Sequence, residues 1–292
     1  MSERQNPLRM TPKSVRAAGH RGHSAGAPEN TLAAFRMAHE IIKGGGRGGA
    51  GENDPNNLVV TCETDLALTL DHELILIHDE TVDRTTDGHG LVRNMTYAEI
   101  ASLDAGSWFD PSRRFKGERV PLLREALQLA RELGGSLVFQ LELKVYGRDD
   151  IILPKLKALI DELQCADLLQ FSSFDFVQLR AVKKLIPGVP TVGLCHSRLI
   201  DPVAAARDAD LDAFNIEIYH FPTSGEQVQK LHEAGFAVFL AVLPLDPLET
   251  LKSYGSDVEA QVVEWVRQGL VDQIVSNDVS EMIRIRNKSL LN

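Results

Sequence analysis

Short apolar runs rich in β-branched residues alternate with helix-like segments along almost the whole of this 292-residue chain. Repeated strand–helix units of this kind predict an α/β protein whose consecutive parallel strands are joined by helices. The chain has no tandem repeat and no linker of the sort that separates domains. For one domain of this length the pattern favours a (β/α)8 TIM barrel, with an open doubly wound sheet as the alternative.

The strand-like segments number one more than a closed eight-stranded barrel needs. Only three residues separate the second from the third, so these two are expected to form a tight hairpin and to be the irregular part of the barrel. Folding the chain about Asp71 and His72 would place His78 opposite Asp65 and Leu66. The predicted strands are 15–20, 58–70, 74–78, 137–143, 168–171, 191–194, 213–218, 237–242 and 273–275.

Helical periodicity predicts a helix after most of these strands. Asn30 is the expected N-cap of the first helix, and the glycine- and asparagine-rich stretch 44–57 is a predicted loop. An irregular segment at about 80–120 reads as a small insertion after the third strand, within a single domain over 14–292 that follows a polar N-terminal tail over 1–13. The predicted helices are 31–42, 97–103, 122–133, 151–163, 174–185, 202–208, 225–234, 258–268 and 279–288.

Composition excludes several classes of protein. The net charge of −10 comes without a basic stripe, so no nucleic-acid partner is expected. Residues 1–13 lack the apolar centre of a secretory signal, and no apolar run approaches the roughly 18–20 residues of a transmembrane helix. The three cysteines are too few and too far apart for a disulfide framework. A soluble, cytoplasmic protein is therefore expected, and its oligomeric state is not indicated.

Histidines and charged residues stand where several predicted strands end. Gly-His-Arg-Gly at 19–22 ends the first strand, Ile-His-Asp at 77–79 the third, and Leu-Glu-Leu-Lys at 141–144 the fourth. In barrel enzymes the working residues lie at the carboxyl ends of the strands. A charged residue that alternates with leucine can also simply face solvent, so the argument depends on several strand ends sharing this feature.

The residue types at these strand ends suit proton transfer to and from a phosphate ester. Imidazole titrates near neutrality, so one of His20 and His78 could withdraw a proton while the other donates one. Arg21 offers a planar fork that can hold two phosphate oxygens, although an ion pair at the rim would use the same residue type.

Glu63 and Asp65 are separated by one residue, so both point to the same face of a strand. Two carboxylates there repel each other unless a cation or an arginine lies between them. Glu142, arriving from another strand, could complete a three-carboxylate site, and oxygen ligands suit Mg²⁺, Ca²⁺ or Mn²⁺. The simpler alternative is a solvated acidic pair on an edge strand. Together with the histidines, the pattern indicates metal-assisted cleavage of a phosphate ester.

These motifs resemble those of the glycerophosphodiester phosphodiesterase family. The resemblance extends from about His20 to at least Gly193, and its most specific part is the ordered set His-Arg, Glu-x-Asp, His. The matching segments are 19–22, 27–35, 63–65, 78–86, 104–109, 141–144 and 172–175.

The resemblance implies a TIM barrel whose small insertion lies beside the active site. It implies that Glu63, Asp65 and Glu142 bind one divalent cation, Mg²⁺ or Ca²⁺. It also implies that His20 and His78 form the general acid–base pair, with either one as the base.

Three further residues receive roles from the same resemblance. Arg21 and Lys144 would hold the phosphate, and Glu29 would lie beside the site without binding the cation. The implied reaction is metal-dependent hydrolysis of a small glycerophosphodiester, such as glycerophosphocholine or glycerophosphoethanolamine, to sn-glycerol 3-phosphate and an alcohol. The attacking hydroxyl belongs either to water or to the glycerol itself.

Two alternatives remain open: one concerns the substrate, and the other concerns whether the protein is an enzyme. A lysophospholipase D or sphingomyelinase D-like enzyme would expose an apolar patch beside the barrel mouth, to which Trp108, Phe109 and Phe115 could contribute. A non-catalytic phosphate-ester binding protein could keep the same scaffold. The chain also departs from the family pattern near its end. Segment 239–243 lacks a tryptophan at the strand end, and Val-Ser-Asn-Asp-Val-Ser at 275–280 replaces the usual Thr-Asp-x-Pro.

Overall fold

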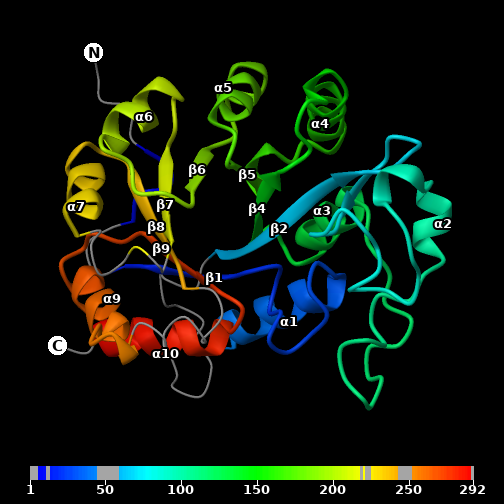
Figure 1. The fold of residues 1–292 in the computed structure, drawn as a ribbon, viewed down its shortest axis with the longest axis horizontal. Coiled ribbons are helices and arrows are strands. Elements are labelled where there is room, and N and C mark those ends of the chain that lie inside the picture. Colours follow the sequence, from blue (N-terminus) through cyan, green and yellow to red (C-terminus); the bar gives the residue numbers. More distant parts are fainter. Residues whose placement is uncertain are drawn as a thin grey trace.

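A closed barrel of parallel strands forms the centre of the molecule (Figure 1). The computed structural model describes residues 6–10, 14–44, 59–217, 220, 225–242 and 252–290. Within these ranges β1 pairs in parallel with both β2 and β9, which closes the ring. The predicted TIM barrel is therefore confirmed. Its strands are β1 (Arg16–Gly19), β2 (Val60–Leu68), β4 (Leu137–Leu143), β5 (Leu169–Ser173), β6 (Thr191–Cys195), β7 (Ala213–Glu217), β8 (Ala237–Ala241) and β9 (Gln273–Ser276).

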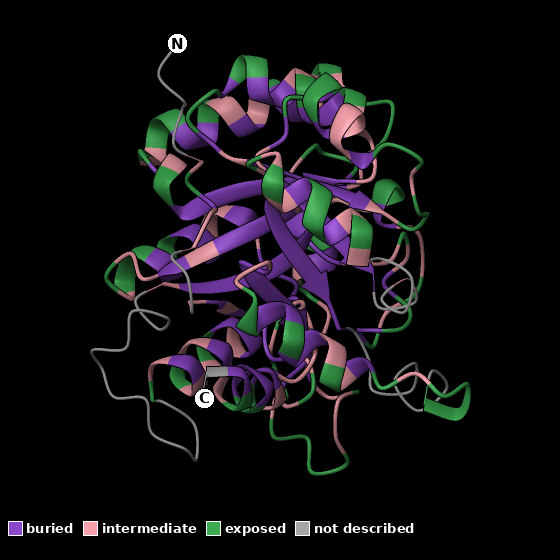
Figure 2. Cartoon of the chain, turned by 90° about the vertical axis from the view of Figure 1, so that its left-hand side faces the viewer, coloured by how far each residue is buried: buried purple, intermediate pink, exposed green. Residues whose placement is uncertain are grey.

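The helices cover the outside of the barrel, each with a buried face towards the strands and an exposed face towards solvent (Figure 2). Among the described helices, none has both the length and the apolar character needed to cross a lipid bilayer. Most of the predicted loop 44–57 lies outside the described residues. The helices are α1 (Leu32–Lys43), α2 (Tyr97–Ala101), α3 (Leu123–Glu132), α4 (Asp149–Leu163), α5 (Phe176–Leu185), α6 (Pro202–Asp208), α7 (Gly225–Glu233), α9 (Val258–Arg267) and α10 (Val279–Leu290).

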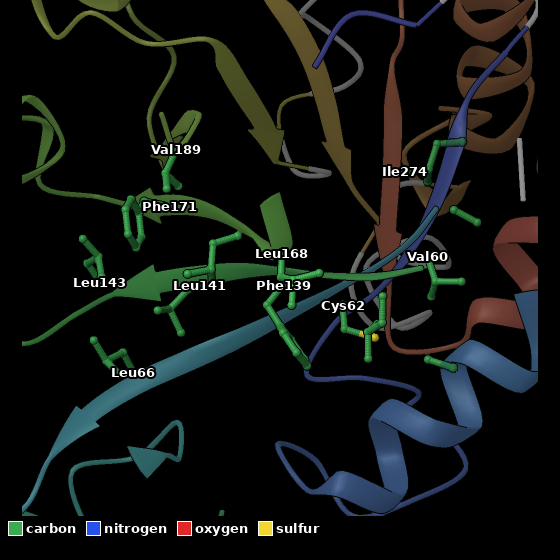
Figure 3. Packing of buried hydrophobic residues seen from close by; sticks show 14 of the residues in the cluster. Val60, Cys62, Leu66, Phe139, Leu141, Leu143, Leu168, Phe171, Val189 and Ile274 are labelled. Carbon is green, nitrogen blue, oxygen red and sulfur yellow. The ribbon is translucent and has the colours of Figure 1, made fainter. Parts of the chain in front are cut away.

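The main hydrophobic core lies between the barrel and these helices. Leu66 of β2 and Phe139 and Leu141 of β4 belong to it (Figure 3). Because side chains alternate along a strand, the intervening residues of β2 and β4 point into the barrel. Those residues include Glu63 and Glu142, so the strand alternation that builds the outer core also places acidic groups inside the ring.

The hairpin predicted after β2 is confirmed, and its register differs slightly from the one expected from the sequence. β3 (Leu74–Leu76) is antiparallel to β2, and Leu66 pairs with Leu76. Residues 69–73 connect the two strands, and His72 among them has φ +63°. With this pairing, His78 does not lie opposite Asp65 and Leu66. It lies beyond the last paired residue, just after Ile77, whose N–H donates to the Asp65 carbonyl at 3.1 Å.

Residues 6–10, within the segment predicted as a tail, close the amino-terminal end of the barrel. The Asn6 amide donates to the carbonyls of Asp212 (2.6 Å) and Gly235 (3.0 Å), which precede β7 and β8. The Leu8 side chain is 5% exposed and packs with Val192 and Phe239 inside the barrel. This segment thus completes the interior core below the polar end of the barrel.

Replacing Leu8 with alanine is expected to lower the free energy of unfolding by about 2–4 kcal/mol, because it removes buried methyl groups and leaves a cavity. Urea denaturation measures this loss. Leu185→Ala is the matched control: that leucine is 39% exposed, and its loss is expected to be below about 1 kcal/mol. Equal losses in the two variants would show that residues 6–10 do not support the barrel.

Candidate active site

The Gly-His-Arg-Gly motif forms the turn that follows β1 at the carboxyl end of the barrel. The His20 N–H donates to the Ser276 carbonyl at the end of β9 (2.8 Å). Gly22 has φ +81°, and a Cβ at this position would lie 2.7 Å from the Ala34 backbone. Arg21 also adopts a left-handed conformation, with φ +56°. The motif therefore has a steric reason: only a glycine at 22 allows this tight turn, which presents His20 at the barrel mouth.

His20 is held between the ends of two adjacent strands. Its Nδ1 lies 2.6 Å from Asn277 Oδ1, and its Nε2 lies 3.7 Å from Glu63 Oε2. Burial, followed by the positive charge of Arg21, lowers the pKa of His20 to about 4. The imidazole is therefore neutral at physiological pH. With Nδ1 as the donor to Asn277, Nε2 carries the lone pair.

The three acidic residues singled out from the sequence lie together. β2 and β4 are neighbours, with Asp65 in register with Glu142. One carboxylate oxygen from each of Glu63, Asp65 and Glu142 lies within 4.8 Å of the others. Glu63 and Asp65 are 5% and 1% exposed, so they are not a solvated pair on an edge strand.

The carboxylates of the cluster repel one another, and the nearby cations offset this repulsion only at Asp65. Burial and then the charge of Asp65 raise the pKa of Glu63 well above its usual value, and the same two causes raise the pKa of Glu142 to about 7. Burial acts in the same direction on Asp65, but Lys144 and Arg21 outweigh it and lower the pKa of that residue. Glu63 Oε1 is buried without a hydrogen-bond partner. An all-oxygen cluster with an unsatisfied buried oxygen fits a hard divalent cation.

Asn30 was predicted to be the N-cap of α1, but the cap is Thr31, and Asn30 supports the acidic cluster instead. Thr31 caps the helix by accepting a hydrogen bond from the Ala34 N–H, which leaves the Asn30 side chain for other contacts. Asn30, at φ +58°, donates from Nδ2 to Asp65 Oδ2 (2.8 Å), and its Oδ1 accepts from the Thr64 hydroxyl (2.7 Å). The sequence places two good capping residues side by side and does not show which of them caps.

His78 and Asp79 follow β3 and form a hydrogen-bonded pair. His78 Nδ1 lies 2.6 Å from Asp79 Oδ1, and Arg84 Nε donates to Asp79 Oδ2 at 2.7 Å. The hydrogen bonds from Arg84 are the main reason that the pKa of Asp79 lies below its usual value. Arg84 also donates to both oxygens of Glu29 (2.7 Å each). Asp79 and Arg84 were given no role from the sequence, although both lie in the matching segment 78–86.

The two cations predicted to hold phosphate are both engaged by carboxylates of the site. Arg21 donates from a terminal guanidinium nitrogen to Glu29 Oε1 (2.7 Å), and its Nε lies 3.4 Å from Asp65 Oδ2. Lys144 Nζ donates to Asp65 Oδ1 at 3.1 Å. Glu29 contacts Arg21 and Arg84 but is not a member of the acidic cluster.

A cavity of about 280 Å³ opens above the acidic cluster, and residues from most strands line it. Glu217 of β7 also lines this cavity, and the sequence reasoning missed it. Burial raises the pKa of Glu217 to about 7, and Asn215 Nδ2 donates to its Oε1 at 3.0 Å. The signal was present, because Asn-Ile-Glu at 215–217 repeats the alternation of Glu63-x-Asp65 at a strand end. The site residues that line this cavity are His20, Arg21, Glu63, His78, Glu142 and Lys144.

The aromatic residues of the insertion pack mainly on one another. Phe109 lies edge-on to Trp108 and to Phe115, with ring centroids 5.8 and 5.5 Å apart. The Trp108 indole N–H donates to the Ala105 carbonyl at 2.8 Å, and this residue is 39% exposed. These three rings form an internal cluster of the insertion, and none of them lines the catalytic cavity.

Known proteins resemble this chain in sequence and in fold. The family model "Glycerophosphoryl diester phosphodiesterase family" matches residues 61–281. A glycerophosphodiester phosphodiesterase of Caldanaerobacter subterraneus is 31% identical over 92% of this chain and 96% of its own length. Among solved structures, an Oleispira antarctica phosphodiesterase in complex with the product sn-glycerol-3-phosphate has a TM-score of 0.75, 25% identity, and coverage of 93% of this chain and 96% of its own. A glycerophosphodiester phosphodiesterase from Agrobacterium tumefaciens has a TM-score of 0.67 and 25% identity over 92% of this chain and 99% of its own. The chain therefore belongs to the glycerophosphoryl diester phosphodiesterase family.

Proposed function

We propose that this enzyme hydrolyses glycerophosphodiesters to glycerol 3-phosphate and an alcohol, and that the reaction requires one divalent cation. The observation that carries the proposal is the cluster of Glu63, Asp65 and Glu142, because Glu63 and Glu142 line the same cavity as His20 and His78. Family membership supports the reaction class. The structural neighbour in complex with sn-glycerol-3-phosphate supports the product.

The three carboxylates are the residues that would hold the cation, Mg²⁺ or Ca²⁺. The donor set contains only oxygen, and Glu63 Oε1 is buried without a hydrogen bond. When bound, the cation supplies positive charge against the phosphate oxygens. Lys144 and Arg21 line the same cavity and would add their own charge on the phosphate.

His20 is the proposed general base. Its neutral imidazole has an Nε2 lone pair directed towards the cluster, because Nδ1 is occupied by Asn277. This nitrogen would take the proton from the hydroxyl that attacks phosphorus, whether that hydroxyl belongs to water or to the glycerol. A base of this kind typically contributes about 10²- to 10⁴-fold to the rate.

His78 is the proposed general acid. Its Nδ1 lies 2.6 Å from the Asp79 carboxylate, which fixes the ring so that Nε2–H is the group left to donate a proton. As the bond from phosphorus to the alcohol oxygen breaks, Nε2–H would protonate that oxygen. The contrast between an amide oxygen beside His20 and a carboxylate beside His78 is what supports this assignment of base and acid.

The glycerol part of the substrate is placed at the Glu217 end of the cavity. Glu217 and Asn215 are the hydrogen-bonding groups there, and hydroxyl groups are suitable partners for both. This orientation directs the other ester arm, which carries the leaving alcohol, towards His78.

Cation affinity is expected to rise with pH, because a proton competes for the same carboxylates. Since the pKa of Glu142 is raised to about 7 and that of Glu63 is raised as well, affinity should increase by at least about tenfold per pH unit from about pH 5 to 7. Calorimetric titration at several pH values measures this, and a pH-independent affinity would contradict it.

The stability of the metal-free protein is expected to change with pH in the opposite direction. The folded metal-free protein holds protons that the unfolded chain releases near pH 4.3, so its free energy of unfolding should fall as the pH rises through about 7.

The direct test uses purified, metal-stripped protein with glycerophosphocholine, with and without Mg²⁺ or Ca²⁺. Cation-dependent release of glycerol 3-phosphate and choline in equal amounts is expected. A parallel reaction with lysophosphatidylcholine tests the lipid alternative. Choline release from the lysolipid alone, or no release from either diester with the cation bound, would overturn the proposal.

A further inference from the structure

A second and larger cavity adjoins the catalytic one. It has a volume of about 500 Å³, and the two cavities share His78, Lys144 and Tyr146 as lining residues. It runs along the β2–β3 hairpin towards the insertion, on the side of Figure 1 where β2 extends beyond the barrel. We call this second cavity the hairpin groove. Because the proposed general acid lies where the two spaces meet, a group bonded to the oxygen that His78 protonates can enter the groove directly.

The floor of the hairpin groove is aliphatic. Leu66 and Leu68 of β2 are buried, as are Ile77 and Val92, whereas Leu70 on the hairpin turn is 55% exposed. Most of the aliphatic surface left exposed in the groove belongs to Leu70, and an apolar group that covers it gains free energy, whereas these side chains give no hydrogen bonds to a small polar group.

The acidic groups that line the groove are already engaged by arginines. Arg84 donates to both oxygens of Asp79, and Arg93 lies 3.4 Å from Glu80. Arg148, at the mouth, lies 3.6 Å from Asp150. The groove therefore does not present a free carboxylate partner for the ammonium group of choline or ethanolamine among these residues.

We propose that the hairpin groove binds the leaving alcohol, and that the enzyme favours glycerophosphodiesters whose alcohol carries an apolar chain. The inference rests on the proposed function, since it uses His78 as the group that protonates the leaving oxygen. A space of about 500 Å³ lies within the usual range of about 300–1,000 Å³ for pockets that enclose a whole organic ligand. Ethanolamine would leave most of this space unfilled.

The test is a series of sn-glycerol 3-phosphate esters of ethanol, butanol and octanol. These alcohols have nearly the same basicity, so the demand for proton transfer stays constant while the apolar area changes. Each buried methylene is worth up to about fourfold in binding, so kcat/KM is expected to rise at least about tenfold from the ethyl to the octyl ester.

Two variants tie the chain-length effect to the groove. Leu70→Ser removes exposed apolar wall without touching the core, and Ala67→Phe fills part of the groove. Both are expected to lower the ratio of octyl to ethyl kcat/KM at least about threefold. Val177→Ser is the matched control, because Val177 is 77% exposed at the start of α5 and does not line either cavity. It should leave the ratio unchanged.

The outcomes separate this inference from the proposed function. Cleavage of the ethyl ester with no gain for the octyl ester would overturn the groove assignment alone. Cleavage of none of the esters in the presence of the cation would overturn the proposed function. A parallel ester with the octyl chain on the glycerol hydroxyl provides the remaining arm. If that chain raises kcat/KM and Leu70→Ser cancels the gain, the groove serves the glycerol side and the inference is wrong.

Discussion

The His78→Ala variant is expected to hydrolyse glycerophosphocholine about 10²- to 10⁴-fold more slowly than the wild-type enzyme, because the departing choline alkoxide loses its proton donor. The same variant is expected to lose less than about tenfold on a glycerol 3-phosphate ester of p-nitrophenol. Nitrophenolate is a weak base and departs without protonation. Release of alcohol or nitrophenol at saturating cation measures both rates.

The His20→Ala variant is expected to lose activity on both substrates to a similar extent. A general base acts on the attacking hydroxyl, and a better leaving group does not replace it. His89→Ala is the control, because the His89 side chain is 85% exposed and lines neither cavity. If the nitrophenyl ester rescues His20→Ala and not His78→Ala, base and acid are exchanged. If neither variant loses activity on glycerophosphocholine, the histidine mechanism fails.

Glu142→Gln is expected to weaken cation binding by at least about 100-fold and to remove cation-dependent activity at ordinary cation concentrations. Mutation of a residue that hydrogen-bonds to a metal ligand typically lowers metal affinity about 10- to 100-fold, so mutation of a direct ligand should lower it at least as much. Glutamine keeps the shape but removes a negative charge from the cluster. Calorimetric titration with Mg²⁺ and Ca²⁺ measures the affinity.

A stability measurement separates loss of the cation from loss of the fold in Glu142→Gln. Burial and the charge of Asp65 already raise the pKa of Glu142 to about 7, so the metal-free variant is relieved of a repulsion. Its midpoint of urea unfolding should be equal to or above that of the metal-free wild type. Glu162→Gln, on the exposed face of α4, is the control with normal affinity. Wild-type cation affinity in Glu142→Gln would contradict the assignment of the cluster.

The barrel and its acidic cluster were predictable because they depend on short periods along the chain. Glu63 and Asp65 share a strand face by the two-residue repeat, and Glu142 ends the next parallel strand. Strand ends of a barrel converge on one rim, so residues far apart in sequence meet there without further information.

Other parts of the site depend on choices that a single sequence does not reveal. The turn between β2 and β3 contains His72 at positive φ, a conformation that is uncommon for non-glycine residues and that the sequence does not reveal. Asn30 supports Asp65 because Thr31 takes the capping position, and both residue types are good caps. Asn277 lies beside His20 only through the β1–β9 pairing that closes the barrel.

The lining of the hairpin groove was also not predictable from the sequence. Leu66 and Leu68 look like ordinary core leucines of a strand, and the sequence gives no reason to assign either to a binding surface. They line a cavity at the part of β2 that continues beyond its pairing with β1 and pairs with β3 on that edge. The proposed substrate preference therefore depends on the hairpin and the insertion, and the proposed chemistry depends on the barrel rim.

Titration of the metal-free enzyme with Mg²⁺ or Ca²⁺ while glycerol 3-phosphate release from glycerophosphocholine is followed tests the central claim most directly. The rate should rise in proportion to bound cation, reach its plateau at one ion per chain, and return to background on chelation. Full turnover by the metal-free enzyme in the presence of chelator would contradict the account.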